Sequence, residues 1–395
     1  MTLAPPANDV PEALRWSPAD STGSGNSAEK IVRTVLARRR TFGITRLGSI
    51  TRLDRIGIPV AQVVRPLALS NAVAQGKGLT LIEAAASALM EAVETWAAER
   101  IPEDKLQVAS AAEIGPAAAS LFSGMVSAEA DAHWSTRPLA WVDGWDLFSS
   151  TIIPVPAALV DTQYTWPSPH PRVFARTTTG LGAGASLRAA FIQAACEVLE
   201  RQAVSAADRD VCFFDRWQMD LSKVGRASAG LLHKLREAHL LVGAWRVPAP
   251  HRLPVYWVHV MEKDEGSELA PLPAEGFACA FDHDLALAKA LLEACQARLA
   301  AIAGAREDMT RRTYLEEYDR AQLAEWRVQL AEPPRPLRWD GSALPSPSDP
   351  VDTLIDALAK AGARAAIVVP LFSDEAAGIH VLRLVAPPLD PGRRH

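Results

Sequence analysis

The sequence predicts an α+β fold, on three observations. Helical and strand-forming stretches are interspersed, without the regular strand–helix–strand period of a parallel α/β sheet. Apolar residues make up 49% of the 395 residues and charged residues 22%, the balance of a folded chain with enough material for a large core. The third observation is that three of the helical stretches resemble one another, which indicates a structural repeat.

The first half of the chain alternates strands and one long helix. Residues 1–35 are predicted to be a disordered tail, because Pro, Ser, Asn, Gly and Asp dominate its first part. Residues 43–66 carry β-branched residues between Gly and Pro, which indicates two short strands. A glycine-flanked lysine, Lys77, then leads into a helix expected from about Thr80 to Ala98. Residues 138–161 are predicted to be strands joined by a turn.

The second half continues the mixture. Residues 162–184 are rich in Pro and Gly, so they form either a linker or a loop over a site. A second long helix is expected from about Ser186 to Ala207, and a third from about Leu285 to Ala303. The remaining predicted elements are strands at 240–249 and 253–261, a helix at 351–361, and strands at 365–370 and 379–385.

Composition excludes several classes of protein. The net charge of -5 gives no overall attraction to nucleic acid or to an anionic membrane. No apolar run reaches the roughly 18–20 residues that span a bilayer, and the first residues lack the basic and apolar regions of a secretory signal. The four cysteines form no CxxC pair. We therefore expect a cytoplasmic protein with no nucleic-acid or membrane partner.

The internal repeat carries the functional information. The first helix reads TLIEAAASALMEAVETW from Thr80, the second reads SLRAAFIQAACEVLERQ from Ser186, and each follows a GxG sequence. A third stretch, DLALAKALLEACQARLA from Asp284, aligns with them and puts Arg298 at the last acidic position. In this register the two polar trios are Ser87, Glu91, Glu94 and Gln193, Glu197, Glu200.

Each trio lies on one side of its helix. At about 100° per residue, positions i, i+4 and i+7 fall within about 60° of one another. Four carboxylates brought together by the repeat would repel each other unless cations lay between them. Hard divalent cations prefer carboxylate oxygens, and Mg²⁺ is commonly held by a few carboxylates and phosphate oxygens. The pattern therefore predicts a metal site and a nucleotide, although a single Glu pair of this kind is usually only a solvated helix face.

At this point the residues resemble a known family. The segments GKGLTLIEAAASALMEAVETWAAE and TTTGLGAGASLRAAFIQAACEVLERQA are similar to the two signature segments of YcaO-domain proteins. The resemblance extends from about Arg40 to Pro391, so a YcaO domain is expected over residues 36–391, with the family's fold of pseudo-repeated helix and strand units around a central ATP-binding cavity. It implies ATP and Mg²⁺ as cofactors.

The resemblance also implies roles for individual residues. Glu91, Glu94, Glu197 and Glu200 would hold Mg²⁺ ions that bridge the phosphates, while Ser87 and Gln193 would bond the nucleotide. The family has a phosphate-contacting arginine nine residues after the last glutamate, where Arg209 stands. A further family segment suggests Arg298 or Arg306 as the second phosphate arginine.

Other residues remain open alternatives. Arg46 and Thr51 are candidate nucleotide or phosphate contacts, and Arg46 is as well explained by solvation beside a strand. Lys77 lies between two glycines but lacks the GxxxxGK[ST] spacing of a phosphate loop, so a structural turn explains it equally. No catalytic nucleophile or base stands out: Cys196 is best explained as a core thiol.

The family resemblance implies ATP-dependent activation of a peptide backbone amide. LDRIGIPV and GITRLGSIT are similar to YcaO proteins that work with a TfuA-like partner, some of which form thioamides. The alternatives are azoline formation by a cyclodehydratase and a nucleotide-binding scaffold without turnover. Dedicated cyclodehydratases often end in PxPxP, whereas this chain ends in APPLDPGRRH. A peptide or protein substrate, a TfuA-like partner and a homodimer are compatible with the family.

Overall fold

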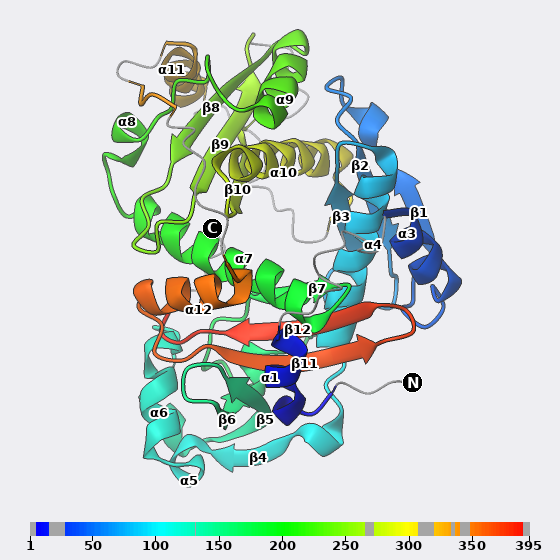
Figure 1. The fold of residues 1–395 in the computed structure, drawn as a ribbon, viewed down its shortest axis with the longest axis vertical. Helices are drawn as coiled ribbons and strands as arrows, with labels where there is room; N and C mark the ends of the chain where they lie inside the picture. Colours follow the sequence, from blue (N-terminus) through cyan, green and yellow to red (C-terminus); the bar gives the residue numbers. More distant parts are fainter. Residues whose placement is uncertain are drawn as a thin grey trace.

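The computed structural model describes residues 5–15, 28–130, 132–264, 272–306, 320–332, 336–339 and 348–389. Its described strands form three sheets, and all the strand pairs within those sheets are antiparallel. Long helices pack against these sheets (Figure 1). The predicted α+β class is therefore confirmed.

Each sheet is a set of antiparallel neighbours. The first has the order β1 (Arg46–Ser49), β2 (Val60–Val64), β3 (Val73–Lys77). The second has the order β10 (Ala274–Cys279), β9 (Val255–Glu262), β8 (Leu240–Arg246). The third has the order β4 (Gln107–Ser110), β5 (Pro138–Asp146), β11 (Ile367–Asp374), β12 (Ile379–Val385), β7 (Leu181–Gly184), with β6 (Thr151–Pro156) paired to β5.

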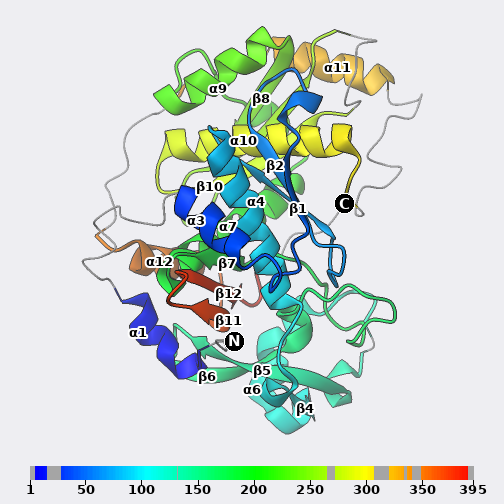
Figure 2. The ribbon, with the colours of Figure 1, turned by 90° about the vertical axis from the view of Figure 1, so that its right-hand side faces the viewer.

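Three long helices lie in the middle of the molecule, and each packs on a different sheet. The helix α4 (Leu81–Ala98) packs on β3, α7 (Leu187–Asp208) packs on β7, and α10 (His283–Ala303) packs on β10. Figures 1 and 2 show α4 and α10 crossing near the first sheet, with α7 between α10 and the six-stranded sheet. These are the three stretches of the internal repeat, so the repeated unit is a strand followed by a helix that covers it.

The shorter helices lie on the outer side of these units or at the ends of the molecule (Figure 2). They are α1 (Val10–Leu14), α3 (Ala28–Ala37), α5 (Ala111–Ile114), α6 (Pro116–Phe122), α8 (Phe213–Arg216), α9 (Arg226–Glu237), α11 (Arg320–Ala331) and α12 (Pro350–Lys360). Within the described residues, no helix combines the length and the apolar character needed to cross a bilayer.

The N-terminal segment differs from the predicted disordered tail where the structure describes it. Val10 and Leu14 are buried against α7, and Arg188 Nη1 donates a hydrogen bond of 2.7 Å to the Leu14 carbonyl. The helix α3 packs on α4. Composition correctly marked the segment as polar, but one apolar pair at i and i+4 is enough to dock a short helix on an existing core. The prediction for residues 1–4 and 16–27 falls outside the described residues.

Candidate functional site

Two glycines bring the repeated helices close to their strands. A Cβ atom at Gly76 would lie 2.0 Å from the Ala88 nitrogen, and one at Gly182 would lie 2.4 Å from the Ala190 oxygen. Only glycine permits this approach of strand and helix backbones. Because β3 meets α4 as β7 meets α7, both helices present the same face of the repeat toward the middle of the molecule.

The start of each helix is fixed by a side-chain cap. Thr80 accepts a hydrogen bond from the Glu83 amide in a capping box, Ser186 accepts one from Ala189, and Asp282 accepts one from Leu285. Each cap satisfies backbone donors that the first turn leaves free, and so defines where the helix begins. The three N-cap residues therefore provide a common structural register for α4, α7 and α10.

The structure brings the acidic trios of α4 and α7 together. The Oε1 atom of Glu94 accepts hydrogen bonds from the Gln193 side chain of the other helix at 3.0 Å and from the Ala183 amide at 2.8 Å. Glu197 accepts one from the Gly180 amide at 3.1 Å. Glu94 of α4 is thus tied to β7, and Glu197 of α7 is tied to the residue just before that strand. We call Glu91, Glu94, Glu197 and Glu200 the acid cluster.

Burial and mutual repulsion make the acid cluster reluctant to ionise. Burial raises the pKa of Glu91 to about 7 and that of Glu200 to about 8, against the influence of nearby cations. Burial, followed by the charges of Glu91 and Glu197, raises the pKa of Glu94 well above its ordinary value. Burial also raises the pKa of Glu197. Perturbed carboxyl groups of this kind cluster at functional sites, and a cation bound among them would favour their charged forms.

A fifth acid and two cations border the acid cluster. Glu293 of α10 pairs with Lys77 of β3 at 2.8 Å, and Arg201 of α7 lies 3.5 Å from Glu200 and 4.0 Å from Glu293. Burial acts against the charge of Arg201, but Glu200, Glu197 and Glu293 outweigh it and raise its pKa. The five acids outnumber these two cations, so full ionisation of the acids would leave negative charge in excess.

The other predicted ligands lie around this cluster. Ser87 is half-buried on α4, one turn before Glu91, and Gln193 is exposed where it reaches Glu94. Arg306, just after α10, lies close enough to Glu91 to lower its pKa. Arg209 is exposed at the C-cap of α7, where it donates to Ser205, about 13 Å along the helix from Glu200 at 1.5 Å per residue.

Arg298 does not join the acid cluster. It is only 1% exposed and is held by Asp54 at 2.8 Å and by Glu262 at 2.5 Å, on a different face of α10. The alignment that put Arg298 at the last acidic position started the third helix at Asp284, whereas its N-cap is Asp282. A shift of two residues turns a helix by about 200°, which exchanges one face for nearly the opposite one.

Two further predicted nucleotide contacts, Arg46 and Thr51, lie in the N-terminal sheet and in the turn that follows its first strand. Arg46 lies exposed in β1. The Thr51 hydroxyl contacts Ser49 at 2.8 Å and accepts a hydrogen bond from the Val60 amide at 3.1 Å, which closes the β1–β2 connection. The structure therefore gives Thr51 a role in the turn and leaves a nucleotide contact by Arg46 as a prediction only.

Sequence reasoning missed Arg201 and Glu293, and left Lys77 undecided. A signal for Glu293 was present: Glu91, Glu197 and Glu293 each lie eleven residues after their N-cap residue. Arg201 directly follows Glu200 and lies at i+4 from Glu197, so it was available from helical spacing. Lys77 needed the tertiary structure, since its partner lies in another element.

The donor set fits Mg²⁺ together with phosphate, on the basis of its chemistry. All five acids provide hard oxygen ligands, and four are desolvated with raised pKa values. Among the described residues, no three carboxylates converge closely enough to enclose an ion by themselves. A metal held here would therefore need oxygens from another molecule to complete its coordination, which is typical of Mg²⁺ at nucleotide sites.

Known proteins share both the sequence and the fold of this chain. An uncharacterized protein in the tfuA 3′ region of Rhizobium leguminosarum bv. trifolii is 30% identical over 89% of this chain and 84% of its own length. The structure of YcaO from Methanopyrus kandleri bound with AMPPCP and Mg²⁺ matches with a TM-score of 0.67 at 24% identity, over 92% of this chain and 91% of that one.

A heterocyclase in complex with substrate and cofactor also matches, with a TM-score of 0.68 at 19% identity. That match covers 91% of this chain and 52% of the heterocyclase, which therefore has a large part without a counterpart here. At these identities the solved structures establish the fold. The family model for the YcaO cyclodehydratases, described as ATP- and Mg²⁺-binding, matches residues 75–390. With the acid repeat in place on this fold, the chain belongs to the YcaO family.

Proposed function

We propose that this protein binds ATP and Mg²⁺ at the acid cluster and uses them to phosphorylate the oxygen of a peptide backbone amide. The observation that carries the proposal is the meeting of two identically spaced trios, whose four carboxyls have raised pKa values, from helices about 100 residues apart in the chain. The family to which the chain belongs supports this reading.

We assign different binding roles to different residues of the site. Glu91, Glu94, Glu197 and Glu200 hold the metal ions, and Ser87 and Gln193 bond the nucleotide. Arg306, which lies near Glu91, and Arg209 are the proposed phosphate contacts. Because Arg298 is already bonded to two carboxylates, we assign it a structural role. When bound, Mg²⁺ supplies neutralisation of the phosphate charge and orientation of the phosphate chain.

Activation is needed because an amide oxygen is a poor leaving group. A nucleophile adds to the amide carbonyl carbon, and the oxyanion that results attacks the γ-phosphorus of ATP, with ADP as the leaving group. The phosphorylated oxygen then departs as phosphate. The arginines and Lys77 bring positive charge to the phosphates as charge moves between them.

For the product, we propose a thioamide formed with a TfuA-like partner and with sulfide as the nucleophile. The relative in a tfuA 3′ region supports this choice. The second candidate is azoline formation, in which a Cys, Ser or Thr side chain of the substrate is the nucleophile; the family description as cyclodehydratases supports it. A peptide or protein substrate is common to both.

One reaction series tests the proposal. The purified protein is incubated with Mg²⁺–ATP, sodium hydrosulfide, the TfuA-like protein of the same genome and candidate peptides encoded nearby, and both ADP and peptide mass are measured. Thioamide formation gives a peptide heavier by the difference between sulfur and oxygen, whereas azoline formation gives one lighter by a water molecule. Both must be accompanied by stoichiometric ADP.

A matched pair of variants controls the series. Glu197→Gln removes one charge from the acid cluster, and Glu237→Gln removes one from the exposed surface of α9. The proposal requires turnover to be lost in the first variant only. A protein that binds ATP but forms no ADP with any peptide and partner would be a nucleotide-binding scaffold, and equal turnover in both variants would rule out the acid cluster as the metal site.

A further inference from the structure

Arg383 is a buried cation outside the acid cluster. It lies in β12 opposite Leu181 of β7, and only 4% of it is exposed. Its Nη2 donates a hydrogen bond of 2.8 Å to the Thr177 carbonyl. Within the described residues, its Nε and Nη1 have no hydrogen-bond partner. The structure therefore keeps a guanidinium desolvated with two of its nitrogens unsatisfied.

This state is unfavourable without a ligand. Removing a charge from water costs several kcal/mol unless a partner replaces the lost hydration. Burial lowers the pKa of Arg383, although Tyr164, Glu197 and Asp161 are near enough to favour its charge. Unsatisfied buried polar groups are rare in folded proteins, and those that persist are commonly explained by a function.

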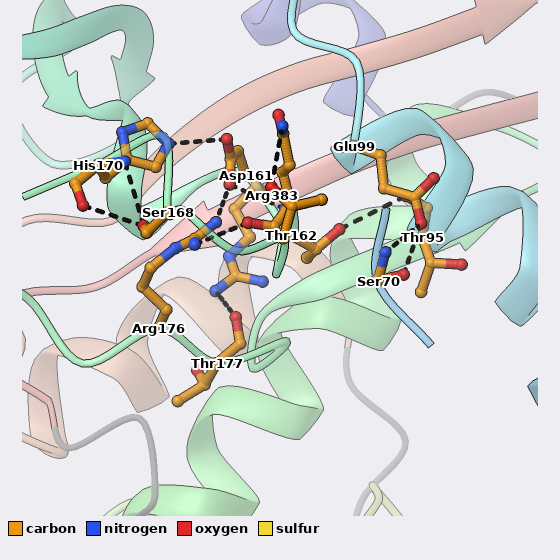
Figure 3. A network of polar contacts seen from close by, with 12 residues as sticks. Ser70, Thr95, Glu99, Asp161, Thr162, Ser168, His170, Arg176, Thr177 and Arg383 are labelled. Atoms are coloured by element: carbon orange, nitrogen blue, oxygen red, sulfur yellow. Dashed lines mark hydrogen bonds and ion pairs between the residues drawn. The ribbon is translucent and has the colours of Figure 1, made fainter. Parts of the chain in front are cut away.

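A second arginine adds to the positive charge beside it. Arg176 pairs with Asp161, which is also bonded to His170 at 2.7 Å, and the Arg176 charge further lowers the pKa of Arg383. The Nε atom of Arg176 likewise has no hydrogen-bond partner within the described residues. Figure 3 shows Arg383 between this Asp161–Arg176 pair and Thr177. Because Asp161 is bonded to His170 and Arg176, it compensates the charge of Arg383 only in part.

Arg383 lines a small cavity next to the acid cluster. Thr177 and Thr179 are among its lining residues, and the others besides Arg383 are apolar: Met125, Leu159, Ala175, Val198, Leu384, Val385, Ala386 and Leu389. Val198 directly follows Glu197 on α7, and Thr179 precedes the glycine whose amide holds that glutamate. The cavity's volume of about 20 Å³ accommodates one water-sized group, so a peptide segment does not fit.

We propose that Arg383 and this cavity bind a small, weakly hydrated monoanion, the hydrosulfide ion that serves as the sulfur nucleophile beside the acid cluster. The inference rests on the proposed thioamide function and names the site of its nucleophile. A guanidinium is itself weakly hydrated and offers several donors to an anion. The apolar wall suits a soft sulfur ion better than a strongly hydrated oxyanion.

The step balances with the substrates already named. The hydrosulfide sulfur forms a bond to the amide carbon, and the carbonyl π electrons move to oxygen. That oxygen takes the γ-phosphoryl group, and ADP leaves. The carbon–oxygen bond then breaks, phosphate carries away the oxygen and the proton from sulfur, and the carbon–sulfur double bond remains. Hydrosulfide, ATP and the amide thus give thioamide, ADP and hydrogen phosphate without an oxidant or reductant.

Anion binding by the ATP-free protein tests the inference directly. Sodium hydrosulfide and sodium bromide are titrated calorimetrically into the parent protein, Arg383→Met, Arg383→Lys and the control Arg364→Met, an exposed arginine bonded to the Ser120 carbonyl. We expect Arg383→Met to weaken both anions by about tenfold or more, as for a lost charge-assisted hydrogen bond. Arg383→Lys retains part of the affinity, and Arg364→Met retains all of it.

Two further measurements keep the result interpretable. Crystals of the parent protein in bromide should show an anomalous peak in the cavity at Arg383, which does not depend on any variant folding. Mg²⁺–ATP affinity should be the same in Arg383→Met as in the parent. Absence of the bromide peak, equal anion affinity in Arg383→Met, preference for phosphate over hydrosulfide and bromide, or loss of ATP affinity would each overturn the inference.

These outcomes are separate from those of the proposed function. Loss of Mg²⁺–ATP binding in Glu197→Gln with intact hydrosulfide binding would support both sites. Hydrosulfide binding at Arg383 without thioamide formation with any peptide would refute the proposed product while leaving an anion site. Thioamide formation that proceeds equally in Arg383→Met would refute the inference and leave the proposed function intact.

Discussion

Two buried charge clusters lie on the single helix α10, and they differ in how their charges are balanced. At one face, Arg298 is held by Asp54 and Glu262, and Glu262 is also bonded by Arg55. At the other, Glu293 contributes to a group of five acids that pairs with Lys77 and Arg201 and that also experiences the charge of Arg306. The first cluster is satisfied within the protein, whereas the second retains an excess of negative charge.

This difference in charge balance distinguishes a structural charge cluster from a functional one. A satisfied buried ion pair joins elements, since Arg298 connects α10 to Asp54 before β2 and to β9. An unsatisfied cluster destabilises the ligand-free fold and becomes favourable only when cations enter it. Burial alone therefore does not identify a functional charge; the imbalance among its neighbours does. The predictions below test this contrast.

The largest effect is expected from breaking the satisfied cluster. Arg298→Met leaves Asp54 and Glu262 buried with reduced compensation, and breaking a buried pair in this way costs about 3–5 kcal/mol. Urea unfolding followed by tryptophan fluorescence measures the loss. The exposed Lys234 provides a control, Lys234→Met, that should change stability little. A variant as stable as the parent would remove the contrast between the two clusters.

The next effect is on ligand binding by the unsatisfied cluster. Glu200→Gln keeps the shape of the side chain but removes one charge, so we expect Mg²⁺–ATP affinity to fall by about a hundredfold, or about 2.7 kcal/mol. Because Glu200 is repelled by its neighbours, the ligand-free variant should be at least as stable as the parent. Calorimetric titration and thermal unfolding give the two values. A large loss of stability with unchanged affinity would make Glu200 a structural residue.

The third prediction concerns pH. Since the folded-state pKa values of Glu91 and Glu200 are raised to about 7 and about 8, the folded protein keeps protons that the unfolded chain releases above about 4.3. The contribution of these groups is therefore full at low pH and is lost as pH rises through the folded-state values. Between about pH 4.5 and 8 the stability of the ligand-free protein should therefore fall continuously as Glu91 and Glu200 ionise.

The same measurement in Glu91→Gln/Glu200→Gln isolates this contribution from the rest of the molecule. The double variant should show a shallower decline over the same range, because both titrating groups are absent. An identical pH profile in parent and double variant would show that these carboxyls titrate normally and that the cluster is better solvated than the structure indicates.

The last prediction concerns stabilisation by ligand. With Mg²⁺ and ATP at about a hundred times the dissociation constant, the free energy of unfolding should rise by about 2.7 kcal/mol. ATP with a chelator should give much less, because the repulsion between the acids and the phosphates is then uncompensated. Thermal unfolding under the two conditions measures the difference. Equal stabilisation without metal would argue for a nucleotide site that does not use the acid cluster.

The sequence predicted the parts of the site that follow helical periodicity. The two trios share one spacing, and the structure brings Glu94 to Gln193 as the repeat requires. Prediction failed where it depended on register or on weak local signals. The third helix was aligned two residues late, which put Cys295 at the position of Glu293 and Arg298 at the position of Gln296. The strand β10, AEGFAC, was missed because it has no β-branched residue and depends on pairing with β9.

The sequence by itself determined the α+β class and the two acid pairs of α4 and α7, because local propensity and helical spacing depend on residues that are close together in the chain. Only the tertiary structure decided which charges balance each other. Lys77 and Glu293 are 216 residues apart, and Arg298 reaches Asp54 across 244 residues. Whether a buried charge is satisfied depends on such distant neighbours, and so does the unsatisfied state of Arg383 on which the proposed anion site depends.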